Sequence, residues 1–230
     1  MPREILDRGL NDIKQDVMTL GAMVSTAVTN SINALMERNF PISKTIIAED
    51  KVINNRRYAI EHKVLTLIAT QQPLASDLRV LASVLEIIME LERMGDYAKG
   101  IGKINLLLGE GSLLAASKKL PQMATVALNM LSQSLEAFMA VDDELARKIT
   151  TDDDIVDDLY NQVYRELINE IIKDPTSYDR VNYTLWAAHD LERLADRVMN
   201  ICERTIFIHT GEVQEFDDPT VPMDTPYSGK

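Results

Sequence analysis

Residues 91–96 read Leu-Glu-Arg-Met-Gly-Asp, and residues 191–196 read Leu-Glu-Arg-Leu-Ala-Asp. In each stretch a glutamate precedes an aspartate by four positions, which places their Cβ atoms about 5–6 Å apart on the surface of a helix. Like charges at this spacing repel each other. Because the unfavourable pair occurs twice in similar local sequence, we expect a bound cation or a neighbouring basic side chain to offset the repulsion.

The similarity extends upstream of both stretches. Residues 50–54 read Asp-Lys-Val-Ile-Asn and correspond to residues 153–157, which read Asp-Asp-Ile-Val-Asp. An internal repeat of this kind indicates duplicated units that pack against each other. We therefore predict two similar three-helix units, residues 1–111 and 112–212. Residues 213–230 carry three prolines and no apolar period, so they are expected to form a mobile tail.

Composition and periodicity predict an all-α fold. Apolar residues make up 46% of the chain but aromatic residues only 5%, which favours helix over strand. Near the N-terminus, apolar residues recur at steps of three and four, as in helices that pack along a seam. Prolines fall between the periodic segments, and short joints favour antiparallel neighbours in a bundle. Six helices are predicted, at residues 4–38, 42–70, 74–108, 118–140, 142–173 and 178–210.

The charge balance limits the classes of partner. A net charge of −12 is unsuited to nucleic-acid binding and favours cations or basic protein surfaces. Cys202 is the only cysteine, so no internal disulfide is possible and a reducing compartment is expected. The chain shows neither a signal peptide nor a long uncharged apolar run. It is therefore predicted to be cytoplasmic, without direct insertion into a membrane.

Two aspartates stand at positions where the pattern calls for apolar residues. Asp50 and Asp153 each interrupt the apolar seam of a predicted helix, and a buried carboxylate must be paired, metal-bound or neutralised. In each repeat an Asp or Asn follows one turn later. If successive helices pack antiparallel, these side chains meet the Glu-x-x-x-Asp pair of the next helix. The resulting candidate metal ligands are Asp50, Asn54, Glu92, Asp96, Asp153, Asp157, Glu192 and Asp196.

An all-oxygen cluster suits Mg²⁺, Ca²⁺, Mn²⁺ or oxo-bridged iron, and His189 is available as an additional nitrogen ligand in the second repeat. The alternative is a solvated helix face on which Arg and Lys neutralise the acids. Arg93 and Lys99 are near Glu92 in sequence, and Arg57 is placed to neutralise Asp50 within one helix. Both interpretations remain open from the residues alone.

Motifs for catalysis are absent. The chain contains no phosphate-binding glycine loop, no intact dinucleotide-binding motif and no Glu-x-x-His pair of the di-iron bundles. No serine or cysteine has a motif partner that would activate it. We therefore predict no catalytic and no cofactor-binding residues. Trp186, early in the last helix, is expected to anchor packing.

The duplicated Leu-Glu-Arg-x-x-Asp, each copy preceded by Asp-x-x-x-Asp/Asn, resembles the PhoU family of phosphate-signalling regulators. The sequence Ala-Ser-Asp-Leu-Arg at residues 75–79 and the sequence Ile-Phe-Ile-His-Thr-Gly-Glu at residues 206–212 also resemble that family. The resemblance covers about residues 5–212. It implies two pseudo-symmetric three-helix bundles, often assembled as a homodimer.

The resemblance also implies a function and a metal. Family members regulate the phosphate regulon negatively, together with the phosphate ABC transporter and a sensor histidine kinase, which would hold the protein at the inner face of the membrane through its partners. Their acidic clusters bind iron, manganese or magnesium. Transferred by motif, the first site takes Asp50, Asn54, Glu92 and Asp96, and the second takes Asp153, Asp157, Glu192 and Asp196. Because Asn54 is neutral, the first site is expected to bind its cation more weakly.

Two other functions fit the same residues. A metal-dependent hydrolase would use the clusters for chemistry and would need an open coordination position and a base. A metal-free helical adaptor or chaperone would pair the acids with arginine. A non-catalytic regulator is the function that the sequence favours.

Overall fold

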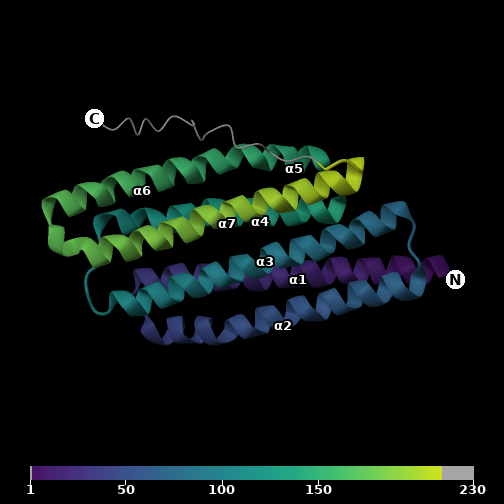
Figure 1. Cartoon of the computed structure of the whole chain (residues 1–230), viewed down its shortest axis with the longest axis horizontal. Coiled ribbons are helices and arrows are strands. Elements are labelled where there is room, and N and C mark those ends of the chain that lie inside the picture. Colours follow the sequence, from purple (N-terminus) through teal and green to yellow (C-terminus); the bar gives the residue numbers. More distant parts are fainter. Residues whose placement is uncertain (1, 214–230) are drawn as a thin grey trace, which may run out of the picture.

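A computed structural model describes residues 2–213 as an all-α protein, and those residues contain no β-strand (Figure 1). Six long helical segments confirm the predicted fold class. The first repeat consists of α1 (Pro2–Met36), α2 (Phe40–Gln71) and α3 (Ala75–Leu108). The second consists of α4 (Leu120–Ala140), α5 (Asp143–Ile149), α6 (Asp153–Lys173) and α7 (Tyr178–Thr210), with short 3₁₀ turns at Ala115–Lys119, Thr150–Asp152 and Pro175–Ser177.

Helix ends follow local chemistry. The Asn39 side chain accepts a hydrogen bond from the Ile42 amide at the start of α2, and the Asp142 side chain accepts one from the Leu145 amide at the start of α5. Such caps satisfy backbone donors that lack a partner inside the helix. The joints that follow α1, α2 and α4 turn through left-handed residues, with φ of 56° at Arg38, 48° at Gln72 and 56° at Val141.

The helix expected over residues 142–173 is interrupted. The 3₁₀ turn Thr150–Asp152 divides it into α5 and α6. The hydroxyls of Thr150 and Thr151 donate to the carbonyls of Arg147 and Lys148, at 2.7 and 2.8 Å. Threonine bonds to nearby carbonyls compete with regular helix geometry, which accounts for the 3₁₀ turn at this point.

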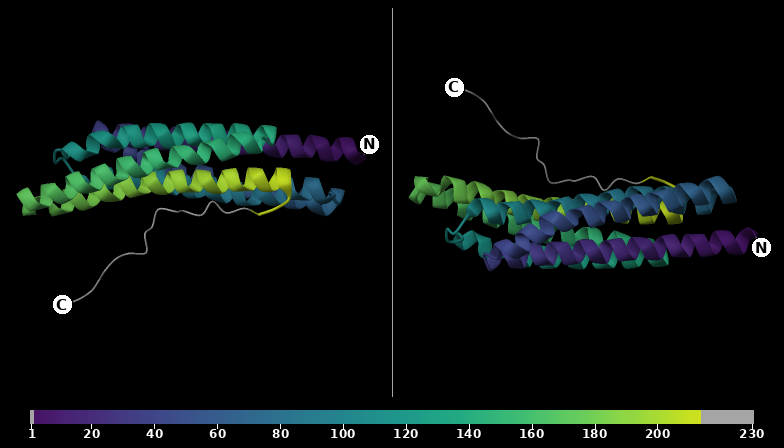
Figure 2. Two further views of the ribbon diagram at one scale, coloured as in Figure 1. Left: turned by 90° about the horizontal axis from the view of Figure 1, so that it is seen from above. Right: turned by 90° about the horizontal axis from the view of Figure 1, so that it is seen from below.

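The helices form two layers (Figure 2). In one layer α1 lies beside α4, and in the other α3 lies beside α7 with α2 and α6 at its outer edges. The α3–α7 contact is the most extensive contact between any two helices, so it is the main seam between the two repeats. Because α3 and α7 run in opposite directions, each repeat presents the same helix to the other in a pseudo-twofold arrangement (Figure 1).

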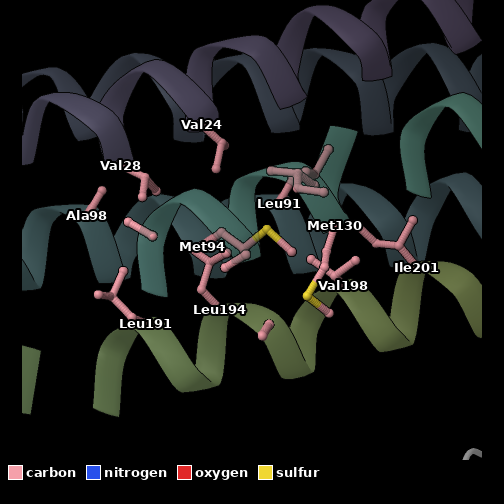
Figure 3. Packing of buried hydrophobic residues seen from close by; sticks show 14 of the residues in the cluster. Val24, Val28, Leu91, Met94, Ala98, Met130, Leu191, Leu194, Val198 and Ile201 are labelled. Carbon is pink, nitrogen blue, oxygen red and sulfur yellow. The ribbon is translucent and has the colours of Figure 1, made fainter. Parts of the chain in front are cut away.

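One continuous apolar core serves both repeats. The first-helix seam predicted from the sequence is buried at Ile13, Val17, Leu20 and Val24. Figure 3 shows side chains from both repeats meeting in this core. The labelled residues are Val24, Val28, Leu91, Met94, Ala98, Met130, Leu191, Leu194, Val198 and Ile201.

Within residues 2–213, no helix combines the length and the apolar character that a membrane crossing requires. The predicted mobile tail lies outside the described residues, apart from Val213 at its beginning.

Candidate acidic sites on the two repeats

The antiparallel packing of α2 and α3 brings the acids of the first repeat together. Asp50 is buried, with 7% of its surface exposed, and Asn54 Nδ2 donates to its Oδ2 atom at 3.2 Å. Glu92 on α3 is half-buried, and burial raises the pKa of its carboxyl. The charges of Asp96 and Asp50 raise that pKa further, and Arg57 opposes them. The first candidate site is therefore one cluster assembled from two helices.

A lysine pairs directly with two acids of this first cluster. Lys99 Nζ donates to Asp50 Oδ2 at 2.8 Å and to Asp96 Oδ1 at 3.2 Å, and these hydrogen bonds raise the pKa of the lysine. The direct partner of Asp50 is therefore Lys99, whereas Arg57 Nη1 bonds to Glu61 at 2.9 Å. Likewise, Arg93 pairs with Glu90 rather than with Glu92.

The second cluster has Asp157 where the first has Asn54, and it lacks that lysine. Glu192 on α7 is partly buried, and burial raises the pKa of its carboxyl to about 7. The charges of Asp196, Asp157 and Asp153 raise the pKa as well, whereas Arg193 lowers it. The structure thus brings the other three predicted residues, Asp153, Asp157 and Asp196, near the Glu192 carboxylate. Met199 occupies the position that corresponds to Lys99, and Tyr160 occupies the position that corresponds to Arg57.

His189 lies at the edge of the second cluster. Its Nδ1 atom is 3.1 Å from Glu192 Oε2, and its ring centroid is 6.2 Å from that of Tyr160. The nitrogen is therefore beside the carboxylate, as the sequence suggested. The first repeat has Met89 at the corresponding position, which contacts Arg57 through its sulfur.

Comparison with known proteins assigns the chain to a family. The PhoU domain matches the chain twice, over residues 17–104 and 120–205. The chain belongs to the PhoU family. Each of the two PhoU matches contains all four residues of one acidic cluster. The duplication seen in the sequence is therefore a duplication of the family's domain.

Relatives of this PhoU chain match it over nearly its full length. A protein of Clostridium acetobutylicum is 31% identical over 95% of the chain and 100% of its own length. A protein of Streptococcus pneumoniae serotype 4 is 34% identical over 94% of the chain and 100% of its own length. Both are named phosphate-specific transport system accessory protein PhoU homolog.

Two crystal structures of PhoU proteins share the fold. The phosphate transport system regulatory protein PhoU of Streptococcus pneumoniae superposes with a TM-score of 0.85 at 33% identity, covering 91% of this chain and 99% of that protein. PhoU of Pseudomonas aeruginosa gives a TM-score of 0.84 at 28% identity, covering 90% of this chain and 99% of its own.

The acids of both PhoU repeats supply the oxygen ligands that a hard cation needs, but the groups around these oxygens differ between the two clusters. In the first cluster, Asp50 Oδ1 and Asn54 Oδ1 are buried and accept no hydrogen bond from the described residues, whereas Asp50 Oδ2 is already bonded to Lys99. In the second, burial and then the neighbouring carboxylates raise the pKa of Glu192, and a bound cation would relieve the repulsion among these carboxylates. Among residues 2–213, no three His, Cys, Asp or Glu side chains already stand in metal-binding positions.

Sequence reasoning offered Lys99 as a partner of the Glu92 and Asp96 pair but missed its bond to Asp50, which links α2 to α3. The available signal was the alignment of the two PhoU repeats, where Lys99 stands opposite Met199 three residues after the motif aspartate. Lysine at that spacing is placed on the same helix face as the aspartate. Its bond to Asp50 required knowledge of how the two helices pack.

Proposed function

We propose that this chain is a non-catalytic regulator of phosphate uptake and of the phosphate regulon. The observation that carries the proposal is the end-to-end match to proteins named phosphate-specific transport system accessory protein homologues, together with the shared fold. A match over the whole length of those relatives supports a shared role better than a match to one domain would.

The proposed partners are the phosphate ABC transporter and a sensor histidine kinase, and the chain would act between them as a homodimer. Its net charge of −12 supports binding to basic surfaces, such as the Lys- and Arg-rich cytoplasmic loops of a membrane transporter. The protein would then work in the cytoplasm, at the inner face of the membrane, when phosphate is ample.

The acidic clusters are proposed to bind a divalent or multinuclear metal, of the iron, manganese or magnesium type. In the second cluster the ligands would be Asp153, Asp157, Glu192 and Asp196, and in the first Asp50, Asn54, Glu92 and Asp96. The metal would offset the repulsion within each group of carboxylates and lock α2 to α3 and α6 to α7.

Deleting the gene in its own host tests the regulatory role. With phosphate in excess, a reporter driven by a phosphate-regulon promoter should be active in the deletion strain and silent in the parent. A plasmid copy of the full chain should restore repression. A reporter that remains repressed by phosphate after the deletion would contradict the proposal.

A further inference from the structure

The seam between α3 and α7 consists of two halves related by the pseudo-twofold symmetry. A residue of α3 corresponds to the residue 100 positions later in α7, so each contact across the seam has a counterpart in the other half. In one half, α3 supplies Glu86 and Glu90. In the other half, α7 supplies Trp186 and Asp190 at the matching positions.

The first half is filled by arginines of the chain itself. Arg197 Nη1 lies 3.4 Å from Glu90 Oε2, and Arg204 Nε lies 3.1 Å from Glu86 Oε2. The Arg204 guanidinium also lies over the ring of Phe207, at 5.9 Å from its centroid. Two carboxylates and one aromatic ring thus surround two guanidinium groups.

The second half lacks both arginines. Tyr97 and Ile104 stand where the first half has Arg197 and Arg204. The result is a groove of about 260 Å³ bordered by Ile104, Leu107, Trp186 and Asp190. Trp186 is not the packing anchor that its sequence position suggested, because 50% of its surface is exposed.

The Asp190 side chain borders this groove and has no ion-pair or hydrogen-bond partner among the described residues. Burial raises the pKa of its carboxyl to about 7, and the charge of Arg193 lowers that pKa. A Cβ atom at Gly100 would stand 2.7 Å from Asp190 Oδ2, so glycine leaves room for the carboxylate. Lys103 also borders the groove, but it is exposed to solvent.

We infer that this groove binds an arginine side chain of a partner protein, with the guanidinium held between Asp190 and Trp186. The filled half of the seam indicates the chemistry, because there the same backbone positions accept arginine. Carboxylates bind guanidinium through paired, charge-assisted hydrogen bonds, and the face of tryptophan attracts it through the ring quadrupole. Lysine lacks the planar donor fork. The inference rests on the proposed function, in which this chain acts by binding other proteins.

The only tryptophan of the chain reports on the groove directly. The full-length ¹⁵N-labelled protein will show one indole N–H signal, from Trp186. We expect N-acetyl-arginine-amide to shift this signal saturably at constant ionic strength. The neutral citrulline analogue should not shift it, and the lysine analogue should bind at least about tenfold more weakly, since a lost charge-assisted hydrogen bond has an effect of that size.

Variants of the groove complete the test. Asp190→Asn and Gly100→Ala should each weaken arginine binding by about tenfold or more, because the first removes the charge and the second displaces it. Asp179→Asn, an exposed acid on the same helix, is the matched control and should bind as the wild type does. An unsaturable or absent shift, an equal response to citrulline or lysine, or unchanged binding in Asp190→Asn would overturn the inference.

The outcome is separable from that of the proposed function. If arginine fails to bind while the reporter strain still requires the chain for repression, only the groove assignment is lost. If arginine binds as expected but the deletion leaves repression intact, the groove serves a partner outside phosphate regulation.

Discussion

The ammonium group of Lys99 makes the two acidic clusters chemically different. It bonds to the buried Asp50 on α2 and to Asp96 on its own helix, whereas the matching Met199 carries no charge. Asn54 in the first cluster is neutral, whereas the matching Asp157 in the second carries a negative charge, so this pair also makes the second cluster the more negative one. A cation that enters the first cluster must therefore displace or tolerate the Lys99 ammonium group, whereas the second cluster has no lysine at that position.

Exchanging the residues at positions 99 and 199 should reverse the difference in cation affinity between the two clusters. In an Asp196→Asn background, Lys99→Met should raise the Mn²⁺ affinity of the first cluster by about tenfold, because it removes a nearby like charge. In an Asp96→Asn background, Met199→Lys should lower the affinity of the second cluster by a similar factor. Calorimetric titration of metal-stripped protein with Mn²⁺ measures both.

Lys103→Met removes an exposed lysine from the same helix and is the control for net charge. It should leave the Mn²⁺ affinity of the first cluster within about twofold of its parent, since exposed charges are well screened. Equal effects of Lys99→Met and Lys103→Met would show that Lys99 does not govern cation binding at this cluster.

At the scale of helices, one buried amide holds the end of the first bundle. Asn105 on α3 is fully buried, and its Nδ2 atom donates to the Ala34 carbonyl of α1 and to the Ser43 hydroxyl of α2, each at 2.8 Å. Its Oδ1 atom accepts from Arg38, in the joint between those helices, at 2.6 Å. The left-handed turn at Arg38 is thereby fixed to all three helices of the repeat.

Removing the Asn105 side-chain amide should destabilise the protein by more than the loss of so small a group would suggest. We expect Asn105→Ala to lower the free energy of unfolding by about 2–3 kcal/mol, because a buried carbonyl and hydroxyl lose their donor. Urea unfolding followed by circular dichroism measures the change. Asn30→Ala, at an exposed position of α1, should change it by less than about 0.5 kcal/mol. Equal losses from the two variants would contradict the role assigned to Asn105.

At the scale of the whole molecule, the charged half of the α3–α7 seam joins the two repeats through ion pairs. Glu90 and Arg197 keep only 13% and 17% of their side-chain surfaces exposed, so an unpaired Glu90 would be largely desolvated. Arg197→Met should therefore lower the free energy of unfolding by about 1–3 kcal/mol, less than for a fully isolated charge because Arg93 remains near Glu90.

The double variant Glu90→Gln/Arg197→Met should recover much of that loss, since it removes the charge that the single variant leaves without its cross-seam partner. Thermal unfolding of the wild type, both single variants and the double variant gives the coupling energy of the pair. Strictly additive losses would mean that this ion pair does not hold the repeats together.

The sequence allowed the prediction of the features that depend on the spacing of apolar residues along each helix. The helices follow from apolar spacing and proline positions, and the meeting of Asp50 with the Glu92 pair follows from antiparallel packing of adjacent helices. The 3₁₀ turn at Thr150–Asp152 was missed because hydroxyl–carbonyl bonds leave no mark on the apolar period. The pairing of Glu90 with Arg197 was missed because it joins residues far apart in the chain, and their contact depends on how two whole bundles dock.

The pseudo-twofold seam has the geometry of an isologous dimer interface built within one polypeptide. Two identical subunits in such a dimer must present identical residues at both halves of the interface, so any substitution appears twice. Joining the units in one chain removes that constraint. Arg197 can therefore stand opposite Tyr97, and one half of the seam holds arginine–glutamate pairs while the other forms a groove.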